Sequence, residues 1–145
     1  MGRQRVRNRH GARRRTGHGR AATRGAATVS ADGERGVVVH LDEDGDDKYR
    51  AVLRNVANLV TDLGGQATVE LVTHGPGIGV CLADSLLAED LQDLIGRGVV
   101  AAACEHTLDA RGIARERLAA GVVTVPSGMA ELVRRQQKGW AYVRP

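Results

Sequence analysis

Short runs of apolar residues alternate with longer amphipathic segments from residue 36 to the end of the chain. The run Val37-Val38-Val39-His40-Leu41 is rich in β-branched residues and predicts a strand. Residues 46–63 carry apolar side chains at helical spacing and are followed by Gly64-Gly65, which predicts a helix closed by glycine. The acidic residues between the two segments suit the amino end of that helix, where the helix dipole favours negative charge.

Four further apolar runs predict four further strands, at residues 67–73, 98–104, 122–125 and 141–144. Helical segments are expected between them, a short one near residues 77–83 and a longer one near residues 85–96. This alternation predicts an α/β protein with a mostly parallel sheet of about five strands and helices on both faces.

Two polar residues are expected to begin the last two helices. Thr107 is predicted to cap a short helix that Gly112 ends, and Ser127 a helix that ends near Gly139. The second helix places one set of side chains on a common face: Met129, Leu132, Val133 and Gln136.

The positive charge of the chain is concentrated at its beginning. Residues 1–35 hold ten Arg and two acidic residues, a balance of +8, whereas residues 36–145 hold eleven Lys or Arg and fifteen acidic residues, a balance of −4. We therefore expect residues 1–35 to be a disordered extension and residues 36–145 to be the folded domain. The extension is either a nucleic-acid-binding tail, acting through salt-sensitive phosphate contacts, or a segment without function beyond a mis-assigned start.

Cysteine usage and hydropathy predict a cytoplasmic protein without a membrane span. Cys81 and Cys104 form no Cys-x-x-Cys motif, which favours free thiols in a reducing compartment. No apolar run approaches the roughly 20 residues that a membrane helix needs. Arg20 and Arg24 interrupt the stretch that an export signal would require to be apolar.

The strongest candidate for chemistry is Cys104, which ends the strand at residues 98–104 and precedes a predicted helix. Ligands of open α/β sheets bind at the carboxyl ends of the strands, and a nearby helix start lowers the pKa of a thiol. His40 and His74 also fall at strand ends, and His106 is close in sequence. Three interpretations remain open: a thiolate assisted by histidine, a Cys/His metal site of the zinc type, and histidines that only bond loop backbone. The spacings match no metal motif, so we predict no metal.

The other candidates are weaker. The turn His74-Gly-Pro-Gly-Ile-Gly79 lacks the dinucleotide-binding spacing, but its Gly75 and Gly77 are candidates for shaping a ligand site. Ser127 and Gly128 begin a helix near the same sheet edge, where free N–H groups could hold an anion. Cys81 lies in an apolar run and is predicted to be a buried thiol, with a resolving thiol as the alternative. Trp140 and Tyr142 are interpreted as anchors for packing or for a subunit interface.

Taken in order, four segments resemble the DsrE/DsrF-like family, small proteins linked with intracellular sulfur oxidation and sulfur relay. The segments are Leu53-Arg-Asn-Val-Ala-Asn-Leu59, His74-Gly-Pro-Gly-Ile78, Ala103-Cys-Glu-His-Thr-Leu108, and Val125-Pro-Ser-Gly128 followed by Gln136-Gln-Lys-Gly-Trp-Ala-Tyr142. The resemblance spans residues 36–145. It implies a YchN-like fold of three layers, α/β/α, a homotrimer or homohexamer, and a persulfide-carrying cysteine whose position Cys104 matches.

The sequence thus predicts a sulfur carrier or sulfurtransferase-like protein in which Cys104 carries sulfane sulfur, supported by His40, His74 and His106. No cofactor is expected. The expected partners are other copies of the chain and sulfur-donor and sulfur-acceptor proteins. The alternative is a non-catalytic oligomeric scaffold, or a small-ligand-binding protein, of the same fold.

Overall fold

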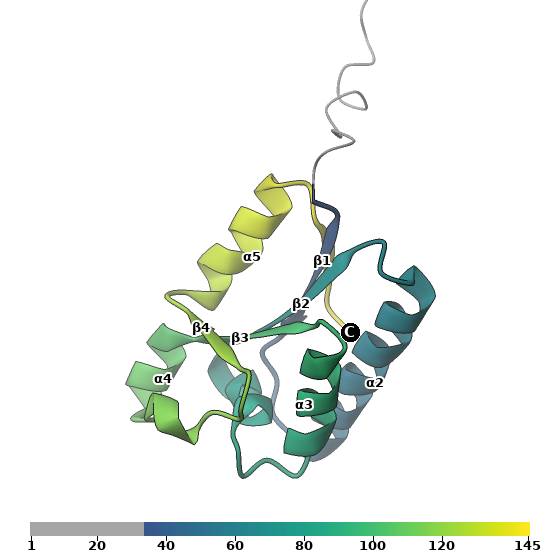
Figure 1. Ribbon diagram of the computed structural model, residues 1–145. Coiled ribbons are helices and arrows are strands. Elements are labelled where there is room, and N and C mark those ends of the chain that lie inside the picture. Colours follow the sequence, from purple (N-terminus) through teal and green to yellow (C-terminus); the bar gives the residue numbers. More distant parts are fainter. Residues whose placement is uncertain (1–33) are drawn as a thin grey trace, which may run out of the picture. The chain divides into compact units, whose positions relative to one another are not determined.

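A computed structural model describes residues 34–145, so the predictions made for the arginine-rich residues 1–33 lie outside the described part of the chain. The described residues form a five-stranded sheet in the order β4-β3-β2-β1-β5, and all four neighbouring pairs are parallel (Figure 1). The strands are β1 (Gly36–Leu41), β2 (Thr68–Thr73), β3 (Val100–Cys104), β4 (Val123–Val125) and β5 (Ala141–Val143).

Helices cover both faces of this sheet, so the predicted three-layer α/β/α fold is confirmed (Figure 1). The larger core lies on the face covered by α2 (Asp46–Leu63), the 3₁₀ segment η1 (Gly75–Cys81) and α3 (Ala88–Gly96). A smaller core lies on the other face, under α5 (Gly128–Gln137). Two short elements, α4 (Glu105–Arg111) and η2 (Arg115–Arg117), connect β3 to β4.

Two cores form because successive residues of a strand point to opposite faces of the sheet. Val37, Val39 and Leu41 of β1 enter the larger core, whereas Val38 enters the smaller one. Helix α2 begins with Asp46 and Asp47 in its first turn and ends at Gly64, which adopts the left-handed conformation (φ 54°). The predicted extent of this helix is confirmed.

The prediction that Thr107 caps a helix is wrong. Helix α4 begins directly after β3, with Cys104 at the N-cap position, so Thr107 lies inside its first turn. The Thr107 hydroxyl instead accepts a hydrogen bond from the backbone N–H of Gly75 at 2.9 Å. Cys104 keeps the extended backbone of the strand (φ −72°, ψ 118°), and this abrupt change from strand to helix places the thiol closer to the helix start than expected.

Ser127 caps α5 as predicted, because its hydroxyl accepts a hydrogen bond from the N–H of Ala130 at 3.2 Å. The expected common face is divided, however. Leu132 is buried, whereas Met129 and Val133 are 59% and 50% exposed. Helix α5 also turns Glu131 inward, where Glu131 pairs with Arg135 of the same helix and Arg135 pairs with the buried Glu70 of β2. This rotation leaves the two apolar side chains in solvent.

Trp140 takes the packing role, the first of the two considered for it, because the chain itself buries this side chain. The indole packs against Gly36 at the start of β1, and the guanidinium of Arg135 lies 4.3 Å above its ring. The absence of a side chain at Gly36 makes this room, since a Cβ there would lie 2.0 Å from the indole. Tyr142 is 42% exposed and contacts His40, as described below.

In the part of the chain that the structure describes, none of the helices has the length and hydropathy of a membrane span.

Candidate functional site

The parallel sheet brings the predicted strand-end residues to one edge. His40 is the penultimate residue of β1, His74 follows the last residue of β2, and Cys104 is the last residue of β3. The register pairs Leu41 with Thr73 and Thr73 with Ala103, so these three strands end almost level. The site therefore lies at the carboxyl ends of three adjacent strands, where open α/β sheets bind their ligands.

Several hydrogen-bond donors surround the Cys104 thiol. Burial raises the pKa of this thiol, but the N–H of Gly128, the hydroxyl and N–H of Thr107, and the N–H of His106 oppose burial and together hold the pKa below its usual value. The donors come from the first turns of α4 and α5. This arrangement stabilises the thiolate, which is the nucleophilic form of cysteine.

Gly128 is the point where Cys104 and His74 come together. A Cβ built on Gly128 would lie 3.1 Å from the Cβ of His74 and 3.3 Å from the Cβ of Cys104. Both side chains thus pack against the start of α5. The missing side chain at Gly128 lets the helix approach the sheet closely enough for its N–H to reach the thiol.

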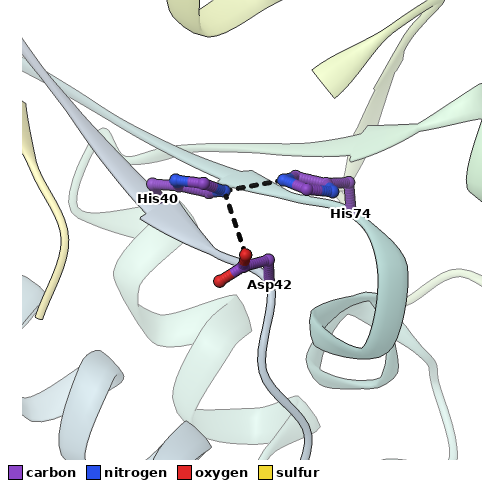
Figure 2. Close-up of side chains that lie close together, drawn as sticks. All are labelled: His40, Asp42 and His74. Carbon is purple, nitrogen blue, oxygen red and sulfur yellow. Dashed lines mark hydrogen bonds and ion pairs between the residues drawn. The ribbon is translucent and has the colours of Figure 1, made fainter. Parts of the chain in front are cut away.

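His40 and His74 form a directly hydrogen-bonded pair beside this thiol site. Their Nε2 atoms are 2.6 Å apart, and Figure 2 shows the two rings edge to edge with the Asp42 carboxylate below them. The other ring nitrogen of His40, Nδ1, lies 2.7 Å from the hydroxyl of Tyr142. The Asp42 carboxylate lies 3.9 Å from Nε2 of His40.

The His40 imidazole is held in its neutral form. Burial lowers its pKa, and the positive charges of His74 and Arg144 add to this effect, while the Asp42 carboxylate opposes it. The Nε2 atoms of the two rings approach within 2.6 Å because one proton lies between the facing nitrogens and forms a hydrogen bond. The cluster of His40, His74 and Asp42 therefore offers a hydrogen-bond donor, a hydrogen-bond acceptor and a carboxylate at the sheet edge.

The side chain of His106 and the polar groups of the remaining predicted site residues do not face the thiol or are already hydrogen-bonded. The ring of His106 is exposed, and it is its backbone N–H that faces the thiol. The N–H groups of Gly75 and Gly77 already donate to Thr107 Oγ1 and to the carbonyl of His74, at 2.9 and 3.0 Å. Ser127 is occupied as the cap of α5.

Cys81 is fully buried in the larger core, as predicted. Burial raises its pKa to about 11, although a contact with the Thr73 hydroxyl at 3.3 Å works in the other direction. Its thiol is therefore kept protonated and away from solvent, which is unsuited to the resolving role considered as an alternative.

Three contributors to this site are not predicted by the local sequence pattern: Asp42, Tyr142 and the Thr107 hydroxyl. Asp42 belongs to the acidic residues that suit a helix start, although its position two residues after His40 is a usable signal. Tyr142 lies 102 residues from His40 in the sequence, and no local pattern connects the two.

Comparison with known proteins supports the relationship seen in the sequence. The model of the DsrE/DsrF-like family matches residues 36–145. The chain belongs to the DsrE/DsrF-like family. Membership places it in a family related to sulfur metabolism. No curated protein matches the chain.

Three solved structures share this fold. A protein of unknown function, MTH1491 from Methanobacterium thermoautotrophicum, is 41% identical with a TM-score of 0.73, covering 77% of this chain and 99% of its own. The ychN protein from E. coli is 17% identical with a TM-score of 0.60, covering 75% and 99% of the two chains. The protein BT1422 from Bacteroides thetaiotaomicron is 12% identical with a TM-score of 0.63, covering 77% and 95%. The last two similarities concern the fold alone.

Proposed function

We propose that this DsrE/DsrF-like protein is a sulfur carrier that holds sulfane sulfur as a persulfide on Cys104. The observation that carries the proposal is the set of donors around the Cys104 thiol, which favours the thiolate despite burial. Family membership in a sulfur-related group supports the same chemistry. The proposal presupposes the reducing, cytoplasmic setting expected from the two free cysteines.

The transfer consists of two displacements at sulfur. The Cys104 thiolate attacks the outer sulfur of a donor persulfide, the donor's S–S bond breaks, and the donor leaves as a thiolate with the bonding electron pair. An acceptor thiolate then attacks the outer sulfur on Cys104, and Cys104 leaves as a thiolate again. Neither displacement needs an outside oxidant or reductant.

The residues around Cys104 have separate roles in this scheme. The N–H groups of Gly128 and Thr107 stabilise negative charge on the attacking and leaving sulfur. The Cβ atoms of His74 and Cys104 both lie beside Gly128, and the paired imidazoles of His40 and His74 supply a site at this sheet edge where a proton can be held or released. His106 contributes through its backbone N–H.

Sulfur loading of Cys104 tests the proposal directly. The full chain is incubated with polysulfide and its intact mass is measured. We expect a gain of about 32 Da, the mass of one sulfur, that dithiothreitol removes and that is lost in Cys104→Ser. Cys81→Ser is the matched control and should load like the unchanged chain, because its thiol is fully buried. An adduct that persists in Cys104→Ser would contradict the assignment.

The scaffold alternative makes a different prediction for the same thiol. In a non-catalytic scaffold or small-ligand-binding protein, the alkylation rate of Cys104 would follow the pH profile of an ordinary cysteine. The midpoint of that profile lies at a pH of about 8.5. A reactive carrier thiol would be alkylated at clearly lower pH. Measuring alkylation of Cys104 against pH therefore distinguishes the two functions without knowledge of the sulfur donor.

We also propose that the chain forms a closed homo-oligomer, a trimer or a hexamer, and docks with separate donor and acceptor proteins. Large apolar side chains stay exposed along the side of the sheet that α5 covers and at both edge strands: Val123, Met129, Val133, Tyr142 and Val143. Contact with neighbouring copies would remove these apolar side chains from water and so stabilise such an assembly. Light scattering of the full chain at micromolar concentration is expected to give three or six chains, and a monomer would refute the proposal.

A further inference from the structure

We propose that His40, His74 and Asp42 form a binding site for a divalent first-row transition-metal ion, with zinc as the first candidate. Each residue offers one ligand atom, and these atoms all lie within 4.8 Å of one another. Two imidazole nitrogens and one carboxylate oxygen form a donor set that such ions bind. This site shares His40 and His74 with the proton-holding pair proposed for the Cys104 chemistry, but zinc binding is measured without sulfur transfer, so its test does not depend on that function.

The two imidazoles already point their ligand atoms toward each other. The Nε2 atom of His40, near the end of β1, faces that of His74, the residue after β2, at 2.6 Å. An ion bound by both Nε2 atoms would replace the proton that lies between them. Each ring would then carry its single proton on Nδ1, which leaves the Nε2 lone pair for the ion.

The surroundings of the pair resemble those of a metal-binding histidine. Nδ1 of His40 lies 2.7 Å from the Tyr142 hydroxyl, so the second ring nitrogen has a hydrogen-bond partner that fixes the ring's orientation. Ligating histidines in proteins are oriented by such outer contacts. His40 is itself buried, which limits competition from water.

The Asp42 carboxylate is held with one oxygen directed toward His40. Its Oδ1 accepts a hydrogen bond from Arg144 at 2.9 Å, and its Oδ2 lies 3.9 Å from Nε2 of His40. Arg144 brings positive charge close to the site. Glu43, which pairs with both Lys48 and Arg144, adds a second negative charge nearby that offsets it.

Only small movements are needed to seat an ion. With ligand nitrogens about 2.1 Å from a tetrahedral zinc ion, two ligand positions are about 3.4 Å apart, so the facing Nε2 atoms would separate by about 0.8 Å. Asp42 follows the end of β1 and can approach by about 1 Å through its side chain. The three protein ligands leave the fourth position open for water or for an anionic ligand.

Zinc binding by the full chain tests the site. Competition with a chromophoric zinc chelator is expected to give one ion per chain at micromolar or tighter affinity. Asp42→Asn, which keeps the size of the side chain, and His74→Gln should each weaken binding at least tenfold. Circular dichroism would verify that both variants are folded. Unchanged affinity in both folded variants would overturn the proposal.

Control variants test whether the remaining histidines or the thiols of the chain contribute to zinc binding. His106→Ala, whose ring is exposed, and a variant with both His10 and His18 changed to alanine should bind zinc like the unchanged chain. Cobalt reports the ligand type, because a thiolate ligand adds an intense sulfur-to-metal absorption band. We expect no such band, and equal binding by Cys104→Ser. A sulfur-to-metal band that disappears in Cys104→Ser would overturn the proposed ligand set, because it would show that Cys104 is a ligand.

Discussion

Arg135→Ala is expected to destabilise the folded chain by about 3 kcal/mol, because it removes the cation from a buried cluster of two carboxyl groups. Nε of Arg135 donates to Glu70, whose side chain is 1% exposed, and also pairs with Glu131 at 2.9 Å. Burial raises the pKa of Glu70 to about 7, helped by the hydrogen bond and negative charge of Glu131, while Arg135 opposes the rise. Urea unfolding followed by circular dichroism measures the loss.

The loss should also depend on pH. Without Arg135 the pKa of Glu70 rises further above its unfolded value, so the folded state holds its proton more tightly than the unfolded state does. Its stability then falls as pH rises from about 5 toward 8, by the linkage between proton binding and folding. We therefore expect a larger difference between Arg135→Ala and the unchanged chain at pH 8 than at pH 5.5.

Arg134→Ala is the matched control for this prediction. Arg134 precedes Arg135 on α5 and pairs with Glu131 at 3.1 Å, but its side chain is 51% exposed. Exposed ion pairs contribute about 0.5 kcal/mol or less. If both variants lose the same stability, the buried cluster has no special importance for the fold.

Gly77→Ala is expected to cost about 3 kcal/mol and to disturb the histidine pair. A Cβ at Gly77 would lie 2.3 Å from the carbonyl oxygen of Leu41, and this backbone at the end of β1 cannot move aside as a flexible side chain could. The N–H of Gly77 also donates to the carbonyl of His74 at 3.0 Å. Moving η1 away from β1 would therefore shift His74 relative to His40, so zinc affinity should fall together with stability.

Gly96→Ala provides the comparison for this substitution. Gly96 ends α3, and a Cβ there would meet no atom within 4 Å. Because alanine is the better helix former, the variant should be as stable as the unchanged chain or more stable by up to about 1 kcal/mol. Equal stability of Gly77→Ala and the unchanged chain would mean that η1 does not pack this closely on β1.

Much of the fold could be predicted because its signals are local. Runs of valine and alanine define β1 and β3, helical periodicity and Gly64 define α2, and strand–helix alternation requires a parallel sheet. Once the sheet is parallel, His40, His74 and Cys104 must share an edge, so the position of the candidate site follows as well. The terminal helix α5 was located correctly from Ser127, yet its rotation was not predicted.

The features that local sequence patterns do not predict depend on contacts between distant segments. Trp140 is buried because Gly36, at the opposite end of the domain sequence, leaves room for its ring, and Glu131 turns inward because Glu70 and Arg135 bind it. The sequence by itself determined the order of the elements and the residues at the sheet edge. Only the tertiary structure decided that His40 meets His74, Asp42 and Tyr142, because hydrogen bonds across 34 and 102 residues have no periodicity in the sequence.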